Sequence, residues 1–156
     1  MKIRVFALTV LVAAMLMMVI QSCEKHGDCS VSNVGGHGKS ESHNMGQNCM
    51  SCHKSGGQGK GCFQLAGTIY NNAGSGTYAN ATVKLYTQPN GAGTLVATVD
   101  GDSKGNAYTT DNINFGSGLY PVVVNAAGQS MYMSSTTTNG SCNSCHGVTE
   151  GVITTF

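Results

Sequence analysis

The sequence is poor in charge, in proline and in aromatic rings. Of its 156 residues, 10% are charged and 6% are aromatic, with two prolines, no tryptophan and one arginine, Arg4. It has no basic patch and no run of like charges, so we expect no nucleic-acid partner. Because prolines are so few, chain flexibility must come from the 22 glycines rather than from polyproline spacers.

Long hydrophobic runs are also scarce, and the one at the N-terminus has the form of a targeting segment. Residues 5–20, "VFALTVLVAAMLMMVI", follow the positive charges of Lys2 and Arg4. An apolar run of about 16 residues is typical of a signal-peptide core, whereas a membrane-spanning helix needs about 20. We therefore expect residues 1–22 to be a signal peptide and the protein to be exported.

The end of this segment, "IQSC" at residues 20–23, resembles the lipobox of bacterial lipoproteins. The resemblance implies that Cys23 becomes the lipid-bearing first residue of the mature chain. The protein would then touch the membrane only through its lipid anchor, at the periplasmic or cell-surface side of the outer membrane. An ordinary secreted protein with a chance cysteine is the alternative, and an uncleaved anchor helix is disfavoured by its short length.

Residues 23–48 are polar, rich in glycine and serine, and show no apolar period. Three of the five histidines lie here: His26, His37 and His43. Such a segment cannot bury a hydrophobic core by itself. It is therefore either a disordered tether or a segment held by something other than protein.

The sequence pattern of residues 65–133 predicts a β domain. They contain short segments rich in Val, Thr and Tyr, mostly alternating, each bounded by Asn, Gly, Asp or Ser. The expected strands are 65–70, 81–86, 94–99, 106–110, 119–126 and 129–133. Six strands at roughly even spacing, with hairpin-type turns and no helical period, indicate an all-β sandwich. The order "AGTIY", "ANATVKLY", "DSKGNAYTT", "GLYPVVVNAAG" resembles the carboxypeptidase-regulatory-like or transthyretin-like sandwich, a structural module without an active site.

Four of the seven cysteines lie in two short copies of one motif, "CMSCH" at 49–53 and "CNSCH" at 142–146. Cys-x-x-Cys-His is the attachment signal for c-type haem, in which two thiols add across the porphyrin vinyl groups and the histidine lies beneath the iron. A zinc ribbon would place its two pairs about 15–20 residues apart, and a thioredoxin-like dithiol would need a βαβ context. Neither condition is met, so we predict two covalently bound haem c groups.

The predicted site residues follow from the motif. The haem thioether links are assigned to Cys49, Cys52, Cys142 and Cys145, and the proximal iron ligands to His53 and His146. The run "HNMGQNCMSCHKSGGQGKGC", then a sandwich, then "GSCNSCHG" resembles small secreted c-type cytochromes of metal-reducing bacteria, in which haem segments flank a β module. The expected fold class is therefore mainly β: an immunoglobulin/transthyretin-like sandwich (65–133) between haem-binding segments at 49–64 and 134–156.

The resemblance implies an electron carrier at the bacterial cell envelope, with other redox proteins or copies of itself as partners. Few carboxylates, no arginine after the signal peptide and no serine-nucleophile elbow argue against an enzyme. A haem-based redox or gas sensor is the alternative, and a small haem reductase or peroxidase is a weaker one. Both require an iron with an open sixth position.

One lipid cysteine and four haem cysteines leave Cys29 and Cys62 without a role. In an oxidising compartment a disulfide between them is the simplest account, and two free thiols remain the alternative. Such a bond would tie the polar N-terminal segment to the start of the sandwich.

Several residues are candidates for the sixth iron ligands. His43 lies ten residues before His53, which makes a shared haem awkward, so we expect His43 at the second haem and His37 at the first. His26 is a weaker candidate. Met131 and Met133 share a face of one expected strand and are the rival distal ligands, whereas Met45 and Met50 flank the first motif. The choice matters because His/Met ligation raises the reduction potential above that of bis-His ligation.

Overall fold

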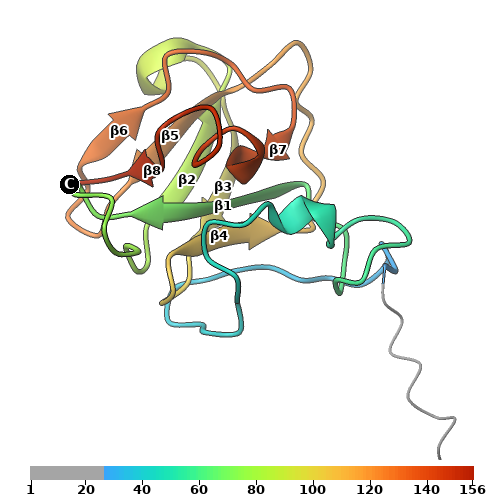
Figure 1. Ribbon diagram of the computed structural model, residues 1–156. Helices are drawn as coiled ribbons and strands as arrows, with labels where there is room; N and C mark the ends of the chain where they lie inside the picture. Colours follow the sequence, from blue (N-terminus) through green and yellow to red (C-terminus); the bar gives the residue numbers. More distant parts are fainter. Residues whose placement is uncertain (1–26) are drawn as a thin grey trace, which may run out of the picture.

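The computed structural model describes residues 27–156 (Figure 1). The predicted signal peptide at 1–22, the lipid site Cys23 and the ligand candidate His26 lie outside these residues. Within 27–156 the chain is mainly β, with two sheets and no α-helix. No helix in this part of the chain has the length and apolar character needed to cross a bilayer.

The first sheet is built around β1 (Leu65–Tyr70). It pairs antiparallel with β4 (Asn106–Thr109) on one side. On its other side it pairs in parallel with two short strands, β7 (Gly140–Ser141) near its start and β8 (Ile153–Thr154) near its end. β1 is therefore the central strand of this sheet.

The second sheet has the order β3-β2-β5-β6, and all its pairs are antiparallel. Its strands are β2 (Thr82–Tyr86), β3 (Leu95–Asp100), β5 (Tyr120–Val124) and β6 (Ser130–Tyr132). The turn between β2 and β3 contains Asn90 and Gly91, both with positive φ (58° and 72°), a conformation that these two residue types tolerate best.

The six strands predicted from the sequence are confirmed, each within a few residues at its ends. The alternation of apolar and polar residues identified them because successive side chains of a strand point to opposite faces. β7 and β8 were not predicted. Each is only two residues long, too short for an alternating pattern. Each pairs with the side of β1 that β4 leaves free.

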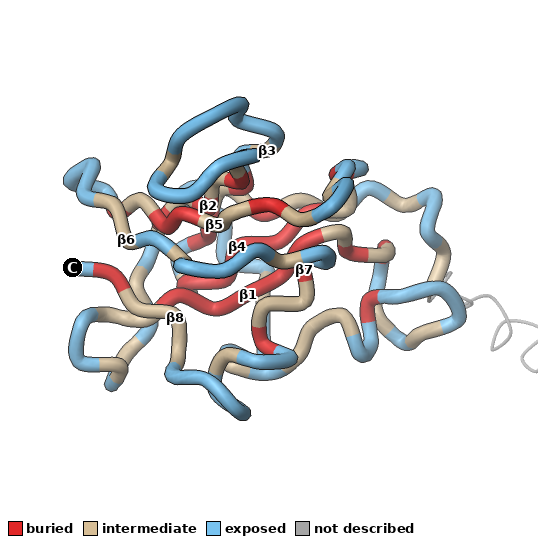
Figure 2. The backbone as a smooth tube through the Cα atoms, turned by 90° about the horizontal axis from the view of Figure 1, so that it is seen from above, coloured by how far each residue is buried: buried red, intermediate tan, exposed pale blue. Residues whose placement is uncertain are grey.

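The two sheets share one hydrophobic core. Buried side chains of both sheets form a single cluster, which includes Leu65, Ile69, Val83, Leu85, Val99, Ala107 and Val123. Figure 2 shows the buried residues along the central strands and the exposed residues in the loops. Alternate residues of β1 face away from this core, and Ala66 belongs to a second, smaller cluster with Phe63 and Tyr108.

The polar segment from residue 27 to residue 64 runs along the outer face of the first sheet (Figure 1). Gly35 N–H donates to the carbonyl of Tyr108 on β4 (2.8 Å), and Thr110 N–H donates to the carbonyl of Asn33 (3.1 Å). Cys29 and Cys62 form a disulfide, with their Cα atoms 4.7 Å apart. The disulfide and these backbone hydrogen bonds hold the segment against β4 although it has no strand of its own.

Candidate functional site

The two Cys-x-x-Cys-His motifs adopt the same local structure. Each begins with a three-residue 3₁₀ turn, η2 (Cys49–Ser51) and η4 (Cys142–Ser144). In each motif the second cysteine and the histidine both donate their N–H groups to the carbonyl of the first cysteine, at 2.9–3.2 Å. The two thiols of a motif are thus held one short turn apart, and the histidine follows directly.

The two motif histidines are anchored in the same way. Nδ1–H of His53 donates to the carbonyl of Lys60 (3.0 Å), and Nδ1–H of His146 donates to the carbonyl of Gly151 (2.7 Å). A carbonyl can only accept, so each ring donates through Nδ1, and in the neutral imidazole the lone pair is then on Nε2. Metal-binding histidines in proteins typically have this arrangement.

The imidazole of His53 lies in a tight setting on the outer face of the first sheet. It is buried and stacks on Phe63, with ring centres 4.0 Å apart and planes within 8°. Gly59 lies against its other side, and a Cβ there would come within 2.6 Å of His53 Cγ. Residue 59 can therefore be only glycine if the ring is to keep this position.

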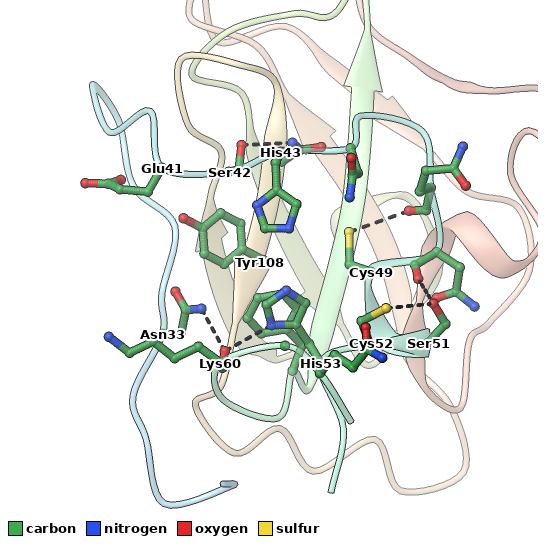
Figure 3. Close-up of a pocket in the computed structure, with 17 residues that line it drawn as sticks. Asn33, Glu41, Ser42, His43, Cys49, Ser51, Cys52, His53, Lys60 and Tyr108 are labelled. Carbon is green, nitrogen blue, oxygen red and sulfur yellow. Dashed lines mark hydrogen bonds between the residues drawn. The ribbon is translucent and has the colours of Figure 1, made fainter. Parts of the chain in front are cut away.

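His43 lies across a cavity from His53. Their ring centres are 6.1 Å apart, with the planes inclined by 36°. Both rings line a cavity of about 700 Å³, and Cys49 and Cys52 line one end of it (Figure 3). A turn with positive φ at Asn44 and Gly46 reverses the chain after His43, which is how two residues ten apart come to face each other.

This spacing fits a metal ion held between the two rings. Each metal–nitrogen bond is about 2.0 Å and each nitrogen lies about 1.1 Å from its ring centre, so two imidazoles on opposite sides of one metal have centres about 6.2 Å apart. The observed 6.1 Å agrees with that value. The cavity volume is in the ordinary range for cofactor pockets, about 300–1,000 Å³. The residues present therefore fit a haem attached to Cys49 and Cys52.

The second motif is set into the edge of the hydrophobic core. Cys142 packs against the core cluster, over Gly67 of β1, where a Cβ would lie 2.8 Å from Cys142 Cβ. Cys145 is exposed and His146 is partly exposed. The first cysteine of the second motif is thus fixed by the sheet, while the rest of the motif faces outward.

The two motifs are direct neighbours although about 90 residues separate them in the sequence. The Ser141 hydroxyl donates to Asn48 Oδ1 (2.9 Å), which also accepts from Met50 N–H at the start of η2 (3.2 Å). Buried Asn143 adds a second link, because its Oδ1 accepts from Thr68 N–H on β1 (2.8 Å) and its amide donates to the Gly46 carbonyl (3.4 Å).

Thiol electrostatics disfavour a redox dithiol. Burial raises the pKa of Cys49, and it raises the pKa of Cys142 to about 12; the neighbouring thiols act in the same direction. A reactive Cys-x-x-Cys needs an attacking cysteine with a lowered pKa. Here the first cysteine of each motif stays a neutral thiol at physiological pH.

A bare metal ion also has no fitting ligand set in residues 27–156. No group of three or more His, Cys, Asp or Glu side chains there could hold one. The observation bears on sites made of protein ligands alone, such as a zinc site. A haem iron needs fewer ligands from the protein, because its porphyrin supplies four nitrogens.

The other ligand candidates lie elsewhere. His37 Nε2 is 3.2 Å from the Thr82 hydroxyl and 3.6 Å from Asp100 Oδ1, beside the second sheet and away from the cavity. Met131 lies on β6 and Met133 follows it, both partly buried. The structure thus brings His43, rather than His37, to the first motif, and the chain reversal at Asn44 and Gly46 is the reason.

Several supporting residues were not singled out from the sequence. Phe63, Gly59 and Tyr108 surround the His53 side of the cavity, and no local pattern marks them. Asn48 and Ser141 had a recognisable signal, because each directly precedes the first cysteine of a motif and is a residue type that caps helical turns.

We expect the Asn48–Ser141 contact to contribute measurably to stability. Ser141→Ala removes one side-chain hydrogen bond and should lower the free energy of unfolding by about 1 kcal/mol. Asn48→Ala also removes the cap of η2 and should cost about 1–2 kcal/mol. Urea unfolding of both single variants and the double variant measures the coupling, and Ser75→Ala, an exposed serine, is the control. Fully additive losses would show that the two motifs are not linked by this bond.

Comparison with known proteins gave no match: no family model fits the sequence, and neither a curated protein nor a solved structure is similar to it. The chemistry of the two motifs and their surroundings is therefore the basis for assigning a function.

Proposed function

We propose that the protein is a dihaem c-type cytochrome that relays electrons at the bacterial cell envelope. The observation that carries the proposal is the opposition of His43 and His53 at 6.1 Å, across a cavity with both thiols of a Cys-x-x-Cys-His motif at its end. Within residues 27–156 no three ligating side chains are arranged to hold a zinc ion, and a thiol redox centre needs no second imidazole at that place.

We assign a separate set of residues to each of the two haems. Cys49 and Cys52 would attach the first, His53 would bind its iron from one side and His43 from the other. Cys142, Cys145 and His146 would attach and ligate the second. When bound, haem c supplies one-electron oxidation and reduction of its iron. Bis-His ligation at the first site favours a low reduction potential compared with His/Met ligation.

The β domain would act as the rigid support between the two sites. We propose that its two sheets form a sandwich of the immunoglobulin/transthyretin-like kind, in which both motifs pack against β1. β1 contacts both η2 and η4, and the Asn48–Ser141 hydrogen bond joins them directly. Close, rigidly held sites suit electron relay, because neither motif has to move for an electron to pass between them.

We also propose a location and a mode of docking for the protein. The segment 1–22 would export the chain, and a lipid on Cys23 would hold it at the outer membrane. Only 10% of the residues are charged, so electrostatic steering of a partner from a distance would be weak. We therefore propose short-range docking to other redox proteins, or to further copies of the same chain.

The haem count is the first test. A chain matured in a host with c-type haem assembly should carry two haems, measured by the pyridine haemochrome assay and by intact mass. Replacing Cys49 and Cys52 by alanine should leave one haem. Replacing Cys142 and Cys145 should also leave one. A colourless wild-type protein, or a mass equal to polypeptide plus lipid, would refute the proposal.

The ligand assignment gives a second test. His43→Ala should convert one of the two haems from low-spin to high-spin, because the iron between His43 and His53 loses an axial nitrogen. His37→Ala is the matched control and should leave both haems unchanged. Visible and electron paramagnetic resonance spectra measure the spin states. An unchanged spectrum for His43→Ala, or a high-spin haem in His37→Ala that the wild type lacks, would contradict the assignment.

A haem-based sensor is the second candidate, and the placement of the histidines favours it at the second site. His37 contacts Thr82 and His43 faces His53, so neither histidine is assigned to the second motif. An open sixth position at the second haem would let the reduced wild-type protein bind one carbon monoxide per chain. Absence of carbon monoxide binding would leave electron relay as the sole function.

A further inference from the structure

The cavity beside His53 has two chemically different ends. Cys49 and Cys52 lie at one end, and Lys60, Tyr108 and Glu41 lie at the other (Figure 3). His43 and His53 lie between them. The second end therefore carries an ammonium group, a phenol hydroxyl and a carboxylate.

The two edges of a haem differ chemically in the same way as the two ends of the cavity. Its two vinyl groups lie on one edge of the porphyrin and its two propionates on the opposite edge. If the vinyl edge is bonded to Cys49 and Cys52, as the proposed function requires, the propionate edge is directed toward the end with Lys60 and Tyr108.

Two hydrogen-bond donors are available at that end. Within residues 27–156, neither the Lys60 ammonium nor the Tyr108 hydroxyl has a hydrogen-bond partner. The nearby amide of Asn33 already donates to the Lys60 carbonyl (2.9 Å), and Lys104 Nζ already donates to the Ser42 carbonyl (2.7 Å). Lys60 and Tyr108 are therefore two unengaged donors for an incoming carboxylate at this end of the cavity.

Tyr108 is suited to donate rather than to ionise. Burial raises the pKa of its hydroxyl, and the negative charges of Asp102 and Glu41 raise it further. The ring itself is fixed by its contact with Phe63, with ring centres 5.1 Å apart. The hydroxyl thus remains a neutral donor at the edge of the cavity.

We propose that the Lys60 ammonium and the Tyr108 hydroxyl bind the propionates of the first haem and raise its reduction potential. The proposal rests on the proposed function. Lys60 would act twice on the same haem, because its carbonyl already holds His53 Nδ1. Its positive charge offsets Glu41 and the propionates, and a positive charge close to the iron favours the reduced form.

Lys60→Gln tests the charge, because the variant keeps the backbone carbonyl that holds His53. We expect two haems, an unchanged low-spin spectrum and a lower midpoint potential for one haem only, measured by spectroelectrochemical titration. Tyr108→Phe keeps the ring against Phe63 and should lower the same potential. Lys84→Gln on β2 removes an equal charge from the second sheet and should leave both potentials unchanged.

The outcomes separate this inference from the proposed function. Titration curves for Lys60→Gln and Tyr108→Phe that superpose on the wild type, with two haems present, would overturn the inference alone. If Lys60→Gln fails to load the first haem, Lys60→Arg decides: restored loading supports the anchoring charge, and loading still absent overturns it. A wild-type protein without haem would overturn the proposed function itself.

Discussion

The structure depends on β1 having two different faces. Leu65 and Ile69 point into the core shared by the two sheets, and Gly67 between them leaves room for Cys142. Ala66 packs on the opposite side with Phe63, beneath the first motif, and Thr68 binds Gly46 N–H through its hydroxyl. Because a strand turns successive side chains to opposite faces, one six-residue element supports both cysteine motifs and joins them to a single core.

The segment before the first motif has a definite place because three kinds of contact hold it. A disulfide closes the loop from Cys29 to Cys62, and that loop contains both His43 and His53. Backbone hydrogen bonds tie Asn33 and Gly35 to β4 and its end. Lys104 donates from the β3–β4 turn to the Ser42 carbonyl, beside His43. A polar stretch without a hydrophobic core of its own thus forms one wall of a cavity.

The two sites differ in their surroundings, and this bears on how they would be tuned. The first has a stacked and buried histidine, a facing imidazole and a charged end with Lys60 and Glu41. The second has a partly buried cysteine packed against the core and a partly exposed histidine. Axial ligation, burial and nearby charge are the levers that set haem potentials, so two identical motifs would not give two equivalent haems.

The sequence by itself determined the local features of this protein. Alternation identified six strands, because the two-residue period is a property of extended backbone, and the spacing within each motif specified two vicinal thiols followed by a histidine. Only the tertiary structure decided which histidine meets which motif. The pairing of His43 with His53 requires a chain reversal at Asn44 and Gly46, and the contact of Asn48 with Ser141 requires β7 to lie beside β1. Such contacts depend on how distant segments pack, and no local pattern encodes them.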